Sequence, residues 1–197
     1  MVKGEKIMII EKQSLFSTNI ASFKYEGHEA FKEKWIAFKK NRDTTNMGRA
    51  ARYNMWTSDP DMFEELGVIF KKCAIQYLKE FYNSVPDIKN LYLEKGWINT
   101  ITPNNYLNVH CHRGKYLAVT YYMETPKNCG NLVLVDPRSN GEWLSSPYII
   151  NGRVEFEPQE GVITIFPGWI MHYIDINKSE FDRVSFSSNI CLADKKR

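Results

Sequence analysis

The sequence lacks the features that would tie it to a membrane or a nucleic acid. It contains no run of about 18 or more apolar residues, the minimum for a bilayer-spanning helix. Its first residues lack the continuous apolar stretch and the small-residue cleavage site of a signal peptide. The formal net charge of +3 is too small to indicate a nucleic-acid or membrane-surface partner. We therefore expect neither among its partners.

Cysteine is scarce and dispersed. The four residues form no CxxC pair and no close spacing: Cys73, Cys111, Cys129 and Cys191. A disulfide framework needs cysteines arranged for pairing, so this pattern favours free thiols in a reducing cytoplasm.

The chain also lacks internal repeats, low-complexity tracts and Gly/Ser/Pro-rich linkers. Hydrophobic residues make up 43% and aromatic residues 14%, which is enough for one folded core. We therefore expect a single domain over residues 1–197, with helical support over 1–90 and a β-sheet core over 91–192.

The first half indicates helices after a short strand near Lys6–Ile10. Apolar residues at helical spacing predict one amphipathic helix over about 28–41. A second helix begins at Asp59-Pro60, an N-cap residue followed by proline, and ends by Pro86. We assign its apolar face to core packing and not to a cofactor contact; the face comprises Met62, Leu66, Ile69, Cys73, Tyr77 and Phe81.

An arginine-containing segment, Asn41–Ser58, separates the two helices and has few apolar anchors. It is either a solvated loop or a lid over the active site that contacts an anionic substrate through Arg49 and Arg52.

The second half has the composition of strands. Short segments rich in Val, Ile, Thr, Tyr and Phe alternate with turn residues such as Asn, Gly and Pro. Several antiparallel strands predict a sandwich or barrel with helices packed on one side. The predicted strands are Trp97–Ile101, Tyr106–His110, Tyr116–Met123, Asn131–Val135, Val162–Phe166 and Arg183–Ile190.

Histidine is rare, and three of the four histidines lie in this strand-rich half. In a strand, residues two apart share a face, so His110 and His112 can converge on one ion, with His172 approaching from elsewhere in the sandwich. Three protein ligands with open positions suit redox-active iron, whereas four closed ligands suit structural zinc. The alternative is a hydrogen-bonded histidine pair and an unrelated core histidine, and the histidines alone leave both open.

Arg183 lies eleven positions after His172, with Ser185 as its neighbour on the same strand face. A buried arginine beside a hydroxyl can bind a carboxylate through two hydrogen bonds. Taken alone, Arg183 is also compatible with a structural ion pair. The ordered combination of His-x-His, a distal His and Arg-x-Ser is more informative than any one of its parts.

This ordered set resembles the Fe(II)- and 2-oxoglutarate-dependent dioxygenases of the double-stranded β-helix fold, in their prolyl-hydroxylase-like branch. The sequence is most similar to the "putative 2OG-Fe(II) oxygenase" group of bacteria and their viruses. The matching segments cover nearly all of residues 97–190, with a fainter match in LFSTNI near the N-terminus. They are WIN, NVHCHRGKYLAVTYYME, GNLVLVDPR, EPQEGVITIFPGWIMH and DRVSFSSNI.

The resemblance implies a jelly-roll (cupin-like) double-stranded β-helix supported by two or more helices. It implies Fe(II) held by His110, His112 and His172, with O₂ as co-substrate. It also implies 2-oxoglutarate held by Arg183, Tyr122 and Ser185. The reaction would be hydroxylation of an unidentified substrate with release of succinate and CO₂, in the host-cell cytoplasm if the chain is virus-encoded. Tyr122 is equally compatible with a core tyrosine.

One position departs from the family pattern, which has an acid as the second ligand where this sequence has His112. Either the three histidines form the site, or the metal-binding motif of the family aligns two residues further along the chain and begins at His112. In the shifted frame His112-Arg113-Gly114 would match iron halogenases, in which glycine leaves room for a halide. Asp136 is the only other carboxylate considered as a ligand, and a turn role is the favoured interpretation for it.

Two further functions stay open: a non-catalytic metal- or ligand-binding β-sandwich, and an interaction protein whose ancestral site has decayed. The substrate would be a small molecule, a nucleotide or a peptide. Arginines that could contact an anionic group are Arg138, Arg49, Arg52 and Arg153. A homodimer is compatible with the sequence, as is a monomer.

Overall fold

Two antiparallel β-sheets face each other in the computed structural model, which describes residues 17–40, 53–82, 90–138 and 152–193. The larger sheet has five strands in the order β1-β7-β4-β9-β2. Its strands are β1 (Ala21–Lys24), β2 (Leu91–Ile101), β4 (Leu117–Glu124), β7 (Val162–Pro167) and β9 (Arg183–Leu192). The smaller sheet has the order β3-β8-β5-β6. Its strands are β3 (Leu107–His110), β5 (Leu132–Val135), β6 (Arg153–Phe156) and β8 (His172–Ile174).

From β2 to β9 the chain crosses repeatedly from one sheet to the other, as in a jelly roll. This arrangement confirms the predicted double-stranded β-helix. All strand pairings are antiparallel. The longest pairing joins β2 to β9 and contains one irregularity, between Leu93 and Gly96.

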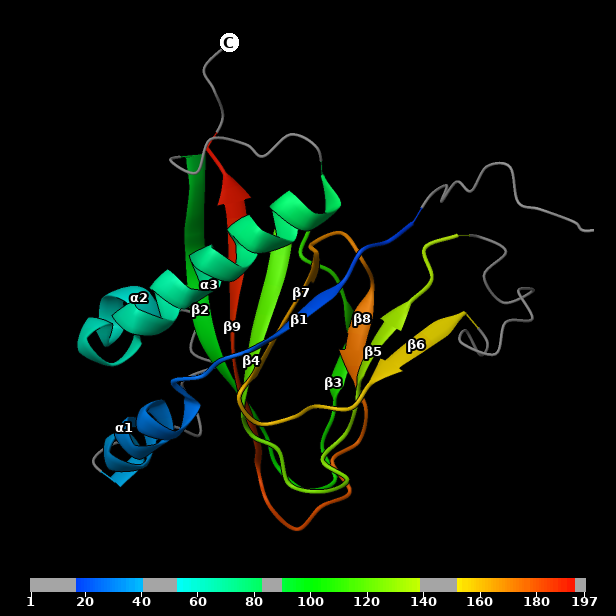
Figure 1. Cartoon of the computed structure of the whole chain (residues 1–197). Helices are drawn as coiled ribbons and strands as arrows, with labels where there is room; N and C mark the ends of the chain where they lie inside the picture. The colour runs from blue at the N-terminus through cyan, green and yellow to red at the C-terminus, as the bar shows by residue number, and fades with distance from the viewer. Residues whose placement is uncertain (1–16, 41–52, 83–89, 139–151, 194–197) are drawn as a thin grey trace, which may run out of the picture.

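Three helices lie on the larger sheet's side of the sandwich (Figure 1). They are α1 (His28–Lys40), α2 (Met55–Ser58) and α3 (Pro60–Phe81). Their apolar side chains pack with the outward-facing residues of the larger sheet into the main core, where Trp35, Phe63 and Phe186 are fully buried. The helices thus cover one face of the sheet and leave the opposite face turned toward the smaller sheet.

Strand β9 shows how its sequence divides these two faces. Val184, Phe186 and Ile190 belong to the helix-covered core. The alternate positions face the smaller sheet, because successive side chains of a strand point to opposite sides. These are Arg183, Ser185, Ser187 and Asn189. The inner face of β9 is therefore polar, and it places side chains capable of binding a ligand between the sheets.

The predicted elements agree with the structure in type and differ in detail. All six predicted strands are present, β2 begins six residues earlier than predicted, and β1, β6 and β8 were not predicted. The helix predicted over 28–41 spans His28–Lys40. The strand predicted near Lys6–Ile10 lies outside the described residues.

The predicted face of α3 was partly wrong. Leu66, Cys73 and Tyr77 are buried, but Phe81 is 38% exposed, and the fully buried Phe63 and Phe70 were not in the predicted set. The helix carries apolar residues over a broad arc, so two overlapping stripes fit the same spacing. Asp59 does occupy the N-cap position, although its side chain makes no capping hydrogen bond.

The described end of the Asn41–Ser58 segment packs on the side of the larger sheet that faces away from the site. Asn54 accepts a hydrogen bond from the Gly96 backbone N–H (3.0 Å), and Met55 and Trp56 lie against the helix-covered side of β2. This side faces away from the space between the sheets. Residues 41–52, with Arg49 and Arg52, lie outside the described part of the chain, so the choice between a solvated loop and a lid stays open for them.

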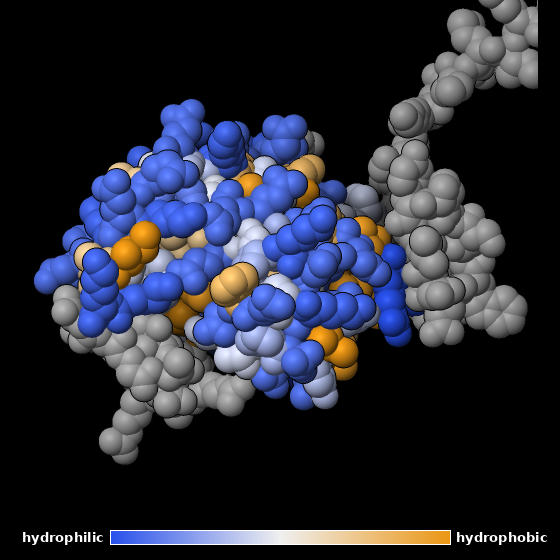
Figure 2. All heavy atoms as spheres, turned by 90° about the horizontal axis from the view of Figure 1, so that it is seen from below, coloured by the Kyte–Doolittle hydropathy of each residue, from blue (hydrophilic) through white to orange (hydrophobic). Residues whose placement is uncertain are grey.

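No helix in the described part of the chain is both long and apolar enough to cross a membrane. The face of the molecule seen in Figure 2 is largely hydrophilic, with hydrophobic residues in small separate groups.

Candidate metal and co-substrate site

Three histidines converge between the sheets. His110 ends β3 and pairs across the ladder with His172, the first residue of β8, while His112 follows two residues after β3. One ligand atom of each histidine lies within 4.8 Å of those of the other two. Within the described ranges this is the one group of three or more potential metal ligands, and we call it the histidine cluster.

Hydrogen bonds orient two of the rings. The Nδ1 atoms of His110 and His172 lie 2.8 and 3.0 Å from the backbone carbonyl oxygens of Asn108 and Ile170. A neutral imidazole whose Nδ1–H donates in this way leaves Nε2 as the free ligand atom. The Nε2 atoms of His112 and His172 lie 3.3 Å apart, so these two rings direct the same nitrogen toward a common point.

Burial keeps two of the histidines, His112 and His172, neutral. Burial, followed by the neighbouring His110, lowers the pKa of His112 to about 4. Burial also lowers the pKa of His172 to about 3. Both imidazoles are therefore unprotonated at neutral pH, which is the state that binds a metal.

A cavity of about 340 Å³ gives access to the histidine cluster. Its walls combine His110 and His112 with inner-face residues of the larger sheet, Trp97, Asn99 and Ser187. The Trp97 ring stacks on His112 at a centroid distance of 5.6 Å. Phe166 of β7 contacts His172 edge-on at 4.9 Å, so the cluster faces the inner surface of the larger sheet.

A second group, which we call the arginine cluster, comprises Arg183, Tyr122 and Ser185 on that inner surface. Tyr122 on β4 pairs with Ser185 on β9, and Arg183 donates to the Ser185 hydroxyl at 3.2 Å. The guanidinium carbon lies 5.3 Å from the centre of the Tyr122 ring. Arg183 and Tyr122 are 1% and 2% exposed.

The arginine cluster is incomplete by itself. Burial lowers the pKa of Arg183 and raises that of Tyr122, and no described carboxylate contributes to the pKa of Arg183. The Arg183 Nε atom and the Tyr122 hydroxyl are buried and have no hydrogen-bond partner. Buried polar groups are almost always paired, so these donors fit a carboxylate supplied by a ligand.

Asp136 and Arg138 do not join either cluster. The Asp136 carboxylate accepts hydrogen bonds from the Arg138 backbone N–H (3.0 Å) and from its guanidinium, which lowers the pKa of Asp136. This confirms the turn role predicted for Asp136.

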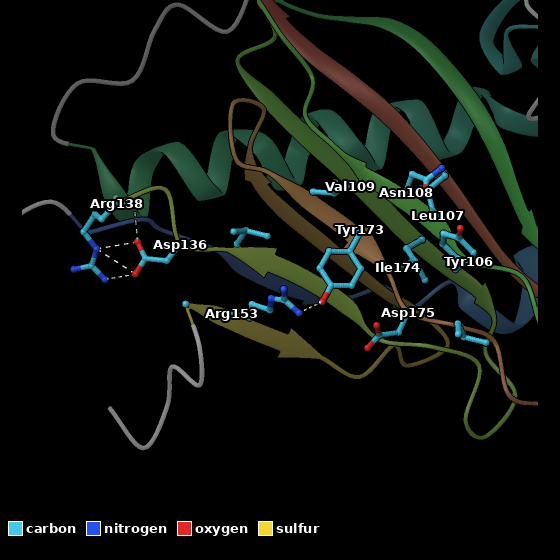
Figure 3. A pocket seen from close by; sticks show the side chains of 13 residues that line it. Tyr106, Leu107, Asn108, Val109, Asp136, Arg138, Arg153, Tyr173, Ile174 and Asp175 are labelled. Atoms are coloured by element: carbon cyan, nitrogen blue, oxygen red, sulfur yellow. Dashed lines mark hydrogen bonds and ion pairs between the residues drawn. The ribbon is translucent and has the colours of Figure 1, made fainter. Parts of the chain in front are cut away.

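Arg138 and Arg153 line a separate cavity of about 600 Å³ that contains none of the three histidines (Figure 3). Arg153 lies there against Tyr173, with a hydrogen bond of 3.3 Å to its hydroxyl.

Gly114 lies in an exposed turn two residues after His112. Its φ of +74° is a left-handed conformation that favours glycine, and a Cβ placed there would meet nothing within 4 Å. The turn therefore accounts for this glycine.

Sequence reasoning missed three residues near the clusters: Trp97, Asn189 and Cys129. Cys129 is 3% exposed, and its thiol is one of the groups that act on the pKa of Arg183, raising it against the effect of burial. Asn189 could have been found, because it continues the alternating inner-face series from Arg183 and Ser185. The stacking of Trp97 on His112 depends on how β2 and β3 are placed, which no local pattern gives.

Residues 95–189 match the family described as "Putative 2OG-Fe(II) oxygenase". No curated protein sequence matches the chain.

Among solved structures, the chain is similar to HygX from Streptomyces hygroscopicus with nickel, 2-oxoglutarate and hygromycin B bound. The TM-score is 0.62 at 14% identity, over 89% of this chain and 83% of HygX. A prolyl-4-hydroxylase from Pseudomonas putida has a TM-score of 0.58 at 11% identity, over 90% of this chain and 87% of the hydroxylase. A 2OG-Fe(II) oxygenase family oxidoreductase from Burkholderia pseudomallei gives 0.52 at 11% identity, over 68% of this chain and 60% of that one. At these identities the likeness establishes the shared fold.

Proposed function

We propose that this chain, a member of the "putative 2OG-Fe(II) oxygenase" family by its match over residues 95–189, binds Fe(II) through His110, His112 and His172. The donor set fits this ion: three neutral imidazoles leave coordination positions for other ligands, and imidazole is a good ligand for iron. Inclusion of His110 in the cluster supports the three-histidine frame. The left-handed φ of Gly114 gives this glycine a conformational role that does not require a halide.

The arginine cluster is proposed to bind 2-oxoglutarate. The observation that carries this assignment is the buried guanidinium of Arg183, whose Nε lacks a partner beside the equally unpartnered Tyr122 hydroxyl. Arg183 supplies the charge for the distal carboxylate, and the Tyr122 and Ser185 hydroxyls supply further hydrogen bonds. The site therefore recognises a dicarboxylate whose two ends differ.

Bound together, the metal and 2-oxoglutarate supply the oxidising chemistry, in which O₂ is consumed and 2-oxoglutarate becomes succinate and CO₂. The residues of the chain provide binding and orientation. Arg183 fixes one end of the co-substrate, the histidines fix the metal, and the polar inner face aligns the two. Three neutral ligands leave the site one unit more positive than a set with one carboxylate, so metal retention depends more on the groups that support the histidines.

The substrate class and reaction outcome extend this proposal. We propose hydroxylation of a small molecule, nucleotide or peptide that enters through the cavity beside Trp97 and His110. The described cysteines are unpaired, which supports a reducing cytoplasm as the site of action. Residues 1–90 and 91–192 are proposed to act as one domain, since α1 and α3 pack directly on the larger sheet.

Uncoupled turnover tests the enzyme class without a known substrate. Anaerobically reconstituted protein, given Fe(II), 2-oxoglutarate and air, is expected to release succinate. His172→Ala and Arg183→Ala should each abolish this release. The matched control is His28→Gln, which alters the fourth histidine; that residue bonds to Tyr121 on the helix-covered side of the sheet.

Succinate release that is equal in all variants would contradict the proposal. Binding of Fe(II) and 2-oxoglutarate without any succinate would instead favour the non-catalytic binding module.

A further inference from the structure

His112 differs from the other two members of the histidine cluster in how its ring is held. The Nδ1 atoms of His110 and His172 each lie beside a backbone carbonyl oxygen. For the His112 ring, the described residues provide one hydrogen-bond contact, between its Nε2 and the Nε2 of His172. A metal-binding histidine usually has a partner for the ring nitrogen that does not bind the metal. The His112 ring therefore depends on other contacts for its orientation.

Trp97 on β2 supplies such a contact. Its indole stacks on the His112 ring, with the two planes 26° apart. The His172 ring is also nearly parallel to that of His112, at 13° and a centroid distance of 5.1 Å. The backbone of His112 is fixed separately, because its N–H donates to the Gly168 carbonyl at 2.7 Å. With the backbone anchored and the ring stacked, His112 can turn about its Cβ–Cγ bond only if the two stacked rings separate.

A β-bulge fixes Trp97 in this place. Between Leu93 and Gly96 the strand β2 advances three residues while β9 advances two, so one residue of β2 is extra. The Gly96 N–H donates to the Asn54 side chain at 3.0 Å, and a Cβ at Gly96 would lie 2.6 Å from the Trp56 ring. The bulge is therefore held from the helix-covered side of the sheet, immediately before Trp97. Bulges beside active sites commonly redirect a side chain in this way.

The stack is expected to be stronger when a metal is bound. Coordination draws electron density from an imidazole and leaves its ring partly positive, whereas the face of an indole carries partial negative charge. Three neutral ligands lack the negative charge of a carboxylate, and the indole face lies against one of them. A contact that is stronger in the metal-bound state raises the affinity for the metal.

We propose that Trp97 is a positioning residue for the metal site. Its indole holds the His112 ring with Nε2 directed toward the other histidines, and it favours the metal-bound form of that ring. This inference rests on the proposed metal site for its effect on affinity. The ring contact itself is a property of the metal-free chain, so it can be measured separately.

The contact is measured first, by NMR of the histidine ring protons in the metal-free protein. The ring current of the indole should shift the His112 ring protons upfield. Trp97→Leu, which keeps apolar bulk without an aromatic face, should remove this shift, and Trp97→Phe should keep part of it. His112 ring protons that are unchanged in Trp97→Leu would overturn the proposal.

Metal affinity is measured second, by anaerobic titration with Co(II), whose visible absorption reports the ligand environment. The stabilisation from one aromatic stack corresponds to an affinity change of about 2- to 10-fold, so Trp97→Leu should weaken Co(II) binding by this factor. Trp97→Phe should lie between Trp97→Leu and the wild type. A wild-type Co(II) affinity in Trp97→Leu would contradict the proposed role.

The matched control is Phe166→Leu. Phe166 also contacts a ring of the histidine cluster, edge-on to His172, but the Ile170 carbonyl already orients that ring. Its loss of Co(II) affinity should therefore be smaller than that of Trp97→Leu. An equal loss in both variants would reduce the effect of Trp97 to general packing. If the wild type does not bind Co(II), the proposed metal site fails, and the NMR comparison alone decides whether Trp97 holds the ring.

Discussion

The histidine cluster lies where a cavity opens between the sheets, with His110 and His112 partly exposed, whereas Arg183 and Tyr122 of the arginine cluster are almost completely buried. Backbone carbonyls already satisfy His110 and His172 before any metal binds. The arginine cluster retains two buried atoms without partners. The histidine cluster is therefore preorganised with little loss of folding free energy. The arginine cluster, in contrast, lowers the stability of the ligand-free protein.

The largest expected effect tests the composition of the histidine cluster. His110→Ala removes a proposed ligand, so metal affinity should fall by more than the roughly 100-fold upper range for an outer-shell partner. Anaerobic Fe(II) titration against a competing chelator measures it. Unchanged affinity would favour the alternative in which the metal-binding motif is His112-Arg113-Gly114.

Arg183→Met should separate the two clusters. Loss of charge-assisted hydrogen bonds worth about 1.5–3 kcal/mol should raise the KM for 2-oxoglutarate roughly 10- to 100-fold. Metal affinity should stay the same. Without 2-oxoglutarate, the melting temperature should not fall, because an unpaired buried charge has been replaced by an apolar side chain of similar length. A large drop in melting temperature with unchanged KM would make Arg183 a structural residue.

Tyr122→Phe should have a smaller effect in the same direction. A neutral hydrogen bond contributes about 0.5–1.5 kcal/mol, so the KM for 2-oxoglutarate should rise roughly two- to tenfold. The hydroxyl has no partner in the ligand-free structure, so the free energy of unfolding should stay near the wild-type value. Lower stability with an unchanged KM would identify Tyr122 as a core tyrosine only.

Arg138→Ala should have the smallest effect. Its guanidinium is exposed and paired with Asp136, so the free energy of unfolding, measured by chemical denaturation, should stay close to the wild-type value. Affinities for metal and 2-oxoglutarate should stay within about twofold of wild type. A marked fall in either would show that the turn supports the site.

Alternation along strands made much of the site predictable. His110 and His112 were predicted to share a face from their spacing, and the structure brings both to His172. The same period places Ser185 beside Arg183. The prediction used only the start of this series, and Asn189 escaped because a lone asparagine on a strand carries no metal-binding signature.

Short strands and wide apolar arcs were less predictable. Strand β8 has three residues, too few to establish a period, and β6 contains charged residues at alternate positions, Arg153 and Glu155. On α3, the sequence did not distinguish Met62 from the adjacent Phe63 as the buried position. These choices are set by tertiary packing against the sheet, which the local sequence does not encode.

The most direct test of the central claim is an anaerobic titration of the Fe(II)-loaded protein with 2-oxoglutarate, followed by visible absorption. We expect a weak charge-transfer band that saturates at one 2-oxoglutarate per chain. Arg183→Met should require a much higher concentration to reach it, and His172→Ala should not develop it. Absence of the band in wild type, or an identical titration in Arg183→Met, would contradict the assignment of the two clusters to metal and co-substrate.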